Sequence, residues 1–172
     1  MAEAETSRPD PTSRPPGTVG VVIVGHGRTA SALLDAASGV LGTCAGLAGV
    51  VAIDAGAGQT NDLEARLHAA VAAADAGAGV LLVADMFGSS PCSCGIRQAM
   101  GHRLAVLAGL NLAMLLKLAM LDRNTLSPAE VAQACAESAR RAVAVQEPAA
   151  HKLPPRPSGP EPTRPPTSEE PS

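Results

Sequence analysis

The sequence predicts an α/β protein, in which strands and helices alternate to form a single domain with a mainly parallel, doubly wound sheet and helices on both faces. Three observations predict it. Runs of Val, Ile and Leu recur without polar alternation, as in strands buried on both faces. Most of these runs are followed by a stretch with apolar residues at helical spacing. Aromatic residues make up only 1% of the chain, so the core must be packed from small aliphatic side chains.

Proline marks the two ends of the chain. Of the 15 prolines, 4 precede Val19 and 9 follow Val145. These ends are also rich in Ser, Thr, Glu and Arg, and they cannot bury enough apolar surface to offset the entropy lost on ordering. We therefore predict disordered tails at 1–17 and 147–172, and one folded domain at 18–146.

Four apolar runs predict the strands. VGVVIV and GVVAID are continuous and short, GVLLVAD ends in an acidic residue, and RLAVLAG ends in glycine. Short continuous runs of this kind, bounded by glycine or charged residues, are typical of parallel strands. The predicted strands are, in order, 19–24, 49–54, 79–85 and 103–109.

Helical spacing and end signals predict the helices. Glycine follows the first three helical stretches, which is a common helix stop. Three polar residues stand where an N-cap is expected, and two of them precede a proline at the first helical position. The predicted N-caps are Asn61, Ser90 and Ser127. The predicted helices are 28–41, 61 to about 76, 90 to about 100, 113–121, and 128 to about 145.

The charge balance and the first residues of the chain exclude several classes of protein. With 13 Lys and Arg against 16 Asp and Glu, the chain has no basic footprint for nucleic acid, and it lacks aromatic residues for base stacking. The start MAEAETSRPD is not a basic segment before an apolar run, and polar residues interrupt the longest apolar stretch, 104–120. We therefore predict a cytoplasmic protein that binds no nucleic acid.

The four cysteines are interpreted as reduced thiols: Cys44, Cys92, Cys94 and Cys135. Cys92 and Cys94 form a C-x-C pair that could begin a metal site. A structural zinc site needs four ligands, usually from two such pairs, and the sequence has no second pair. The sequence therefore favours buried small side chains and predicts no metal.

Residues that can carry chemistry stand where the predicted strands end. His26 lies between two glycines after the first strand, Asp54 ends the second, and Asp85 ends the third. In open parallel sheets, sites form beyond the carboxyl ends of the strands, where the winding reverses. If the first and third strands are neighbours, His26 and Asp85 face each other.

This pair predicts a nucleophilic histidine. A carboxylate that accepts from Nδ1–H fixes the tautomer of the ring and leaves Nε2 as the nucleophile. The turn 88–90 opens a helix whose free N–H groups suit an anion, above all phosphate, and Ser90 can add a hydroxyl donor. Together these features predict phosphoryl transfer through a phosphohistidine.

Three stretches resemble the mannose-type EIIA domain of the bacterial phosphotransferase system. They are V-I-V-G-H-G-x-x-A-x-x-L-L, D-x-F-G-S-S-P and G-L-N-L-A-M-L, and they occur in the family's order within 19–145. The resemblance implies a sheet of order 2-1-3-4 and a homodimer. It also implies a phosphoryl group that is accepted from HPr, with no other cofactor, and passed to an EIIB domain, with a membrane involved only through a transport complex.

The resemblance implies roles for particular residues. His26 would be the phosphorylated residue, Asp85 its orienting carboxylate and Ser90 a phosphate contact. Further contacts to phosphate are expected from Ser89, Gly27 and Arg28, and a partner contact from Phe87. The family often has Gly-Gly-Ser-Pro-Phe-Asn where this chain has GSSPCS, and Pro where it has Ala113. No EIIB-like segment follows, so the acceptor is expected to be a separate protein or a regulatory target.

Three other interpretations stay open. The phosphotransfer subunit of dihydroxyacetone kinase shares the fold and the histidine after the first strand. Small tetrapyrrole metal chelatases also have Gly-His-Gly there, but they need further metal ligands, and His68, His102 and His151 are all expected away from this edge. A signalling module, in which a regulator reads phospho-His26, is the third.

Overall fold

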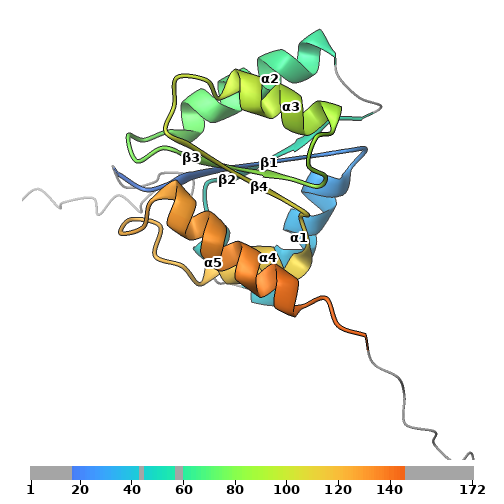
Figure 1. Ribbon diagram of the computed structural model, residues 1–172, viewed down its shortest axis with the longest axis vertical. Helices are drawn as coiled ribbons and strands as arrows, with labels where there is room; N and C mark the ends of the chain where they lie inside the picture. The colour runs from blue at the N-terminus through green and yellow to red at the C-terminus, as the bar shows by residue number, and fades with distance from the viewer. Residues whose placement is uncertain (1–16, 43–44, 57–59, 146–172) are drawn as a thin grey trace, which may run out of the picture.

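The computed structural model describes residues 17–42, 45–56 and 60–145. Within them, four parallel strands form a sheet of order β2-β1-β3-β4 with helices on both faces (Figure 1). The predicted fold class and strand order are therefore confirmed. The predicted tails, apart from Gly17, lie outside the described residues, and so does Cys44.

All the predicted strands and helices are present, and most of their ends differ by one to four residues. The strands are β1 (Gly20–Gly25), β2 (Val50–Asp54), β3 (Val80–Ala84) and β4 (Leu104–Ala108). The helices are α1 (Thr29–Leu41), α2 (Asn61–Ala74), α3 (Ser90–Gln98), α4 (Leu112–Ala119) and α5 (Pro128–Arg141), with a short 3-10 helix, η1 (Ala45–Leu47). The chain winds outward from β1 to β2 and then from β3 to β4, so the winding reverses between β1 and β3.

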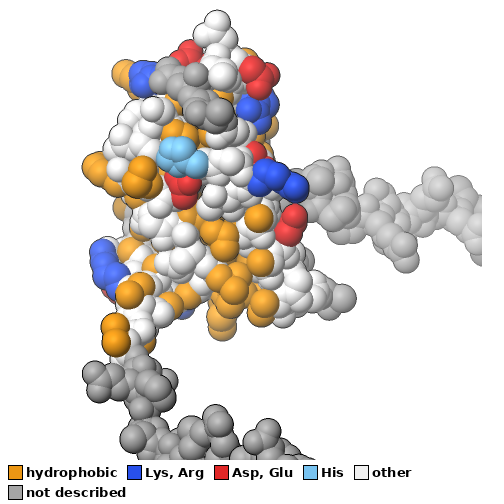
Figure 2. Space-filling model, turned by 90° about the vertical axis from the view of Figure 1, so that its right-hand side faces the viewer, with side chains coloured by type: hydrophobic (Ala, Val, Ile, Leu, Met, Phe, Trp, Pro, Cys, Tyr) orange, Lys and Arg blue, Asp and Glu red, His pale blue; other side chains and the backbone are white. Residues whose placement is uncertain are grey.

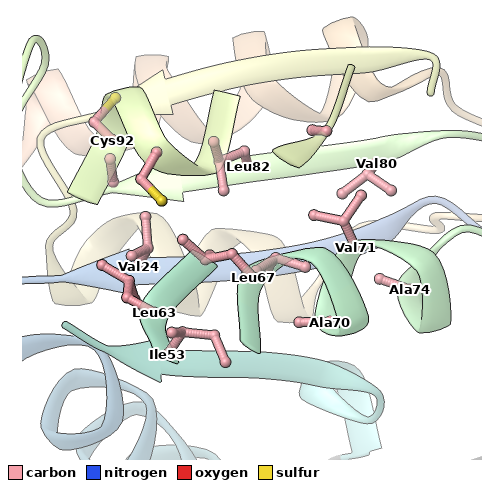
Figure 3. Close-up of a cluster of buried hydrophobic side chains, with 14 of the residues drawn as sticks. Val24, Ile53, Leu63, Leu67, Ala70, Val71, Ala74, Val80, Leu82 and Cys92 are labelled. Carbon is pink, nitrogen blue, oxygen red and sulfur yellow. The ribbon is translucent and has the colours of Figure 1, made fainter. Parts of the chain in front are cut away.

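Two apolar layers hold the sheet, one on each face. Side chains that alternate along β1 and β3, such as Val24 and Leu82, pack against α2 and α3 (Figure 3). Their neighbours, such as Ile23 and Leu81, pack against α1, α4 and α5. Both central strands are buried throughout, which explains why their sequences are continuous apolar runs.

Two of the predicted N-caps are wrong by one residue. Thr60 caps α2 in place of Asn61, and Ser89 caps α3 in place of Ser90; each accepts a hydrogen bond from the backbone N–H three residues later. The backbone of Thr60 and Ser89 is extended, which aims the side-chain oxygen at the first turn, whereas the following residue is already helical. The predicted cap at Ser127 is confirmed and forms a capping box.

The cysteines of the described residues behave as small buried side chains. Cys92, Cys94 and Cys135 are all buried, and burial raises the pKa of the Cys135 thiol to about 11. Within the described ranges, no three His, Cys, Asp or Glu side chains are grouped so that they could hold a metal ion. No helix of the described ranges is long and apolar enough to cross a membrane.

Gly20 allows β1 to approach the end of α2. A Cβ atom at this position would lie 2.1 Å from the carbonyl oxygen of Ala74. Because backbone atoms must move to admit it, Gly20→Ala is expected to lower the free energy of unfolding by about 3 kcal/mol. Gly39, an interior position of α1 with open space around it, is the matched control. Gly39→Ala should raise the free energy of unfolding by about 0.5–1 kcal/mol; equal effects of the two variants in denaturant titrations would contradict the close approach.

Candidate functional site

His26 and Asp85 meet at the point where the winding of the sheet reverses. Asp85 Oδ2 lies 2.7 Å from the backbone nitrogen of His26 and 3.0 Å from Nδ1 of the same residue. The side chain of His26 is 45% exposed, whereas that of Asp85 is only 15% exposed. One carboxylate oxygen therefore fixes both the backbone and the ring of an accessible histidine.

The charge of Asp85 determines which ring nitrogen is free. Burial raises the pKa of Asp85, but hydrogen bonds from the backbone N–H and the ring of His26 outweigh burial and hold the pKa below its ordinary value. Asp85 is thus ionised at neutral pH and can only accept hydrogen bonds, so Nδ1 carries the proton. Nε2 keeps a lone pair that can bond to an electrophile.

The loop that carries His26 is also bound to the end of β2. Gly27 N–H donates to Gly56 O at 3.0 Å, and Gly56 N–H donates back to Gly27 O at 3.3 Å. Gly27 has a φ of +55°, which side-chain-bearing residues rarely adopt. Its N–H already has a partner, so Gly27 contributes to the site through its conformation rather than through a free donor.

The turn between β3 and α3 places several donors at the same edge. The Ser89 hydroxyl is buried and donates to Met86 O at 2.8 Å, so it shapes the turn and its proton is not free for a ligand. Ser90 begins α3 and is exposed. Pro91 has no N–H, and the N–H groups of Cys92 and Ser93 donate to Ser89. The hydroxyl and the backbone N–H of Ser90 are therefore the donors that this turn can offer to an anion.

Apolar side chains lie next to these donors. Phe87 is 76% exposed and Met86 is 57% exposed, and together they form what we call the apolar lip. On the face formed by the carboxyl ends of the strands, a histidine side chain lies at the surface beside an acidic side chain and close to hydrophobic ones (Figure 2). Exposed apolar side chains beside a reactive group favour contact with another protein.

Asp54 lies at the same edge of the sheet, and the sequence predicted no role for it. Its carboxylate accepts from the backbone N–H of Ser31 at 3.0 Å and from the Ser31 hydroxyl at 2.6 Å. Burial raises the pKa of Asp54, but the two bonds from Ser31 and the positive charge of Arg28 hold it below its ordinary value. Arg28 itself is exposed, and its charge acts on Asp54 across a distance, without an ion pair.

The other histidines of the described residues lie away from His26. His68 is exposed on α2. His102 precedes β4, at the opposite edge of the sheet, and its Nδ1 lies 2.7 Å from Asp75 Oδ2. That contact joins the loop after α2 to the loop after α3 and holds the pKa of Asp75 below its ordinary value. His151 lies outside the described residues.

Comparisons with known proteins agree with this architecture. Residues 20–136 match the family model EIIA-man, described as PTS system fructose IIA component. A mannose/sorbose-specific IIA subunit of the phosphotransferase system from Enterococcus faecalis is 26% identical, with 77% of this chain and 97% of that chain covered and a TM-score of 0.59. No curated protein sequence shows a significant match.

Two further solved structures share the fold. The phosphotransferase system component EIIA from Streptococcus agalactiae is 23% identical, with 74% of this chain and 96% of that chain covered and a TM-score of 0.62. The PTS IIA protein associated with the fucose utilization operon from Streptococcus pneumoniae is 19% identical, with 74% and 93% covered and a TM-score of 0.61.

Proposed function

Because the chain belongs to the EIIA-man family of phosphotransferase system IIA components, we propose that it is a phosphocarrier that accepts a phosphoryl group from phospho-HPr on His26. It then passes the group to a separate EIIB protein or uses it in regulation. The observation that carries this proposal is the accessible His26 ring, whose Nδ1 lies 3.0 Å from the Asp85 carboxylate. The protein would act in the cytoplasm as a homodimer.

The proposed transfer uses Nε2 as the nucleophile. Nε2 bonds to phosphorus while the bond from phosphorus to the donor atom breaks, and the electron pair of that bond stays with the donor. The ring becomes more positive as the new bond forms. The Asp85 carboxylate, fixed on Nδ1–H, stabilises this charge without having to move. Transfer to the acceptor reverses these steps.

The negative charge of the phosphoryl oxygens is expected to be stabilised by donors at the start of α3. Ser90 offers its hydroxyl and its backbone N–H, which lie at the positive end of the α3 dipole. Ser89 holds the turn through its bond to Met86 O, and the exposed Arg28 is expected to approach the phosphoryl group. No cofactor is needed, because the donor protein supplies the phosphoryl group.

The decisive experiment is phosphorylation of the full chain with phosphoenolpyruvate, enzyme I and HPr. We expect stoichiometric label that is lost in acid and kept in alkali, because phosphorus bonded to a ring nitrogen is acid-labile. A chain that stays unlabelled while a known EIIA domain is labelled in the same reaction would reject the proposal. Label supplied only by a dihydroxyacetone kinase system would assign the chain to that pathway, and cobalt insertion into a tetrapyrrole would assign it to the chelatases.

The apolar lip gives a prediction about partner binding. Phe87→Ala is expected to raise the KM for phospho-HPr about tenfold and to leave kcat nearly unchanged, because an exposed aromatic ring contributes to docking rather than to the reaction. Met100, equally exposed at 77% but at the opposite edge of the sheet, is the control. Steady-state transfer rates over a range of HPr concentrations measure both variants. Equal KM values for Phe87→Ala and Met100→Ala would show that the lip is not the docking surface.

A further inference from the structure

Helix α1 begins without a cap from its own sequence. Its N-cap position is Arg28, which makes no side-chain capping bond, and its first turn contains no acidic residue. The other four α-helices of the described ranges each have a local side chain that accepts from the first turn: Thr60, Ser89, Asn111 and Ser127. The start of α1, three residues after His26, therefore needs an acceptor from elsewhere.

Asp54 supplies that acceptor from the neighbouring strand. It is the last residue of β2 and pairs in register with Gly25 of β1. Its two carboxylate oxygens take the N–H and the hydroxyl of Ser31, in the first turn of α1. Asp54 itself is fixed by Arg66 of α2, whose guanidinium donates two hydrogen bonds, both of 3.2 Å, to the Asp54 carbonyl oxygen.

Two carboxylates thus hold the segment between β1 and α1 at its two ends. Asp85, from the strand on one side of β1, accepts from the backbone N–H of His26. Asp54, from the strand on the other side, accepts from the backbone N–H of Ser31. The segment between them contains Gly27 at positive φ, and its backbone pair with Gly56 holds the middle of the segment.

We propose that Asp54 is a positioning residue for His26: by fixing the first turn of α1, it sets the path of the histidine loop and the direction of Nε2. The proposal rests on the proposed phosphocarrier function. The described structure shows no hydrogen bond or ion pair between Asp54 and the His26 ring, so the effect of Asp54 passes through the backbone from Ser31 to His26. Asp54 takes the Ser31 N–H, and His26 O takes the Thr29 N–H, so Ser90 at the start of α3 is the place proposed for the phosphoryl oxygens.

Single-turnover transfer from phospho-HPr to the full chain tests the proposal. Asp54→Ala is expected to slow transfer about tenfold with an unchanged KM, because a small misplacement of a nucleophile reduces the rate and not the docking. Asp54→Asn keeps an oxygen for the Ser31 N–H and should recover to within about threefold of wild type. Ser31→Ala loses the hydroxyl contacts with Asp54 and with Arg28 O but keeps the N–H bond to Asp54, and it should be about threefold slower. Asp35→Ala, an exposed carboxylate on the same helix, is the matched control and should transfer at the wild-type rate.

A second measurement separates this proposal from the function on which it rests. Long-range proton–nitrogen NMR spectra report which nitrogen of the His26 ring carries the proton, without any partner protein. Asp54→Ala should lower the Nδ1–H population, and Asp54→Asn should restore it. If wild type takes no phosphoryl group, the phosphocarrier function fails, and the spectra still decide the role of Asp54.

Three results would overturn the proposal. The first is a wild-type rate and a wild-type ring spectrum in Asp54→Ala. The second is an Asp54→Asn variant as slow as Asp54→Ala, which would mean that the charge of Asp54, not its hold on α1, matters. The third applies if Asp54→Ala does not fold. Ser31→Ala then tests the proposal, and an unchanged transfer rate in Ser31→Ala would overturn it.

Discussion

His26→Gln is expected to abolish labelling by phospho-HPr altogether. Glutamine has no nitrogen lone pair that can replace the free Nε2, so no phosphoryl bond can form at this position. The side chain is about half exposed, and the main bond lost is the one from Nδ1 to Asp85, so the free energy of unfolding should fall by only about 1 kcal/mol. Radiolabel retained on the protein, together with a denaturant titration, measures both effects.

The remaining histidines provide the controls for this variant. His68→Gln changes an exposed side chain of α2 and should be labelled like wild type. His102→Gln removes the contact with Asp75 at the opposite edge of the sheet, so it should lose some stability but keep its label. If label persists in His26→Gln and disappears in one of the controls, the phosphorylated residue is the histidine changed in that control and not His26.

Asp85→Asn is expected to slow phosphorylation of His26 by about 100-fold or more. The asparagine amide can donate to Nδ1, which favours the tautomer with the proton on Nε2 and so blocks the nucleophile. The neutral amide also cannot stabilise the positive ring that forms during transfer. Rapid-quench measurement of the first turnover tests this, and Asp35→Asn, an exposed carboxylate of α1, is the control. An unchanged rate of phosphorylation in Asp85→Asn would show that Asp85 has no role in the transfer.

The pH dependence of stability gives an independent check on Asp85. Its pKa is lowered in the folded protein, so the stabilisation from its ionised form is present above the unfolded pKa of about 3.9 and is lost as the pH falls through the folded pKa. At pH 7, wild type should be more stable than Asp85→Asn by about 1–2 kcal/mol. The difference should shrink below about pH 4. A difference that grows toward low pH would contradict the ionised state assigned to Asp85.

The strands were predictable because burial on both faces leaves a direct pattern in the sequence. Val21, Val22, Ile23 and Val24 are apolar in succession because alternate side chains enter opposite core layers. Helix caps were less predictable. Thr60-Asn61 and Ser89-Ser90 each offer two adjacent capping side chains, and only the backbone angles decide which one caps.

The candidate site was partly predictable for a similar reason. His26 and Asp85 each follow a recognisable strand, and sites in such sheets form where the winding reverses, so their proximity could be inferred. The role of Ser89 could not, because its hydroxyl is engaged by Met86 O through a turn whose geometry the residue types leave open. The role of Gly27 could not be inferred either, because its N–H donates to Gly56 O in the loop after β2.

The sequence by itself determined the alternation of strands and helices, the histidine between two glycines and the carboxylates at the strand ends, because these depend on burial and on local spacing. Only the tertiary structure decided which groups those carboxylates hold. Asp85 takes both N–H groups of His26, and Asp54 takes Ser31 of a helix that begins after a different strand. Such bonds join residues 23 and 59 positions apart, and their formation depends on strand order and register, which no local pattern encodes.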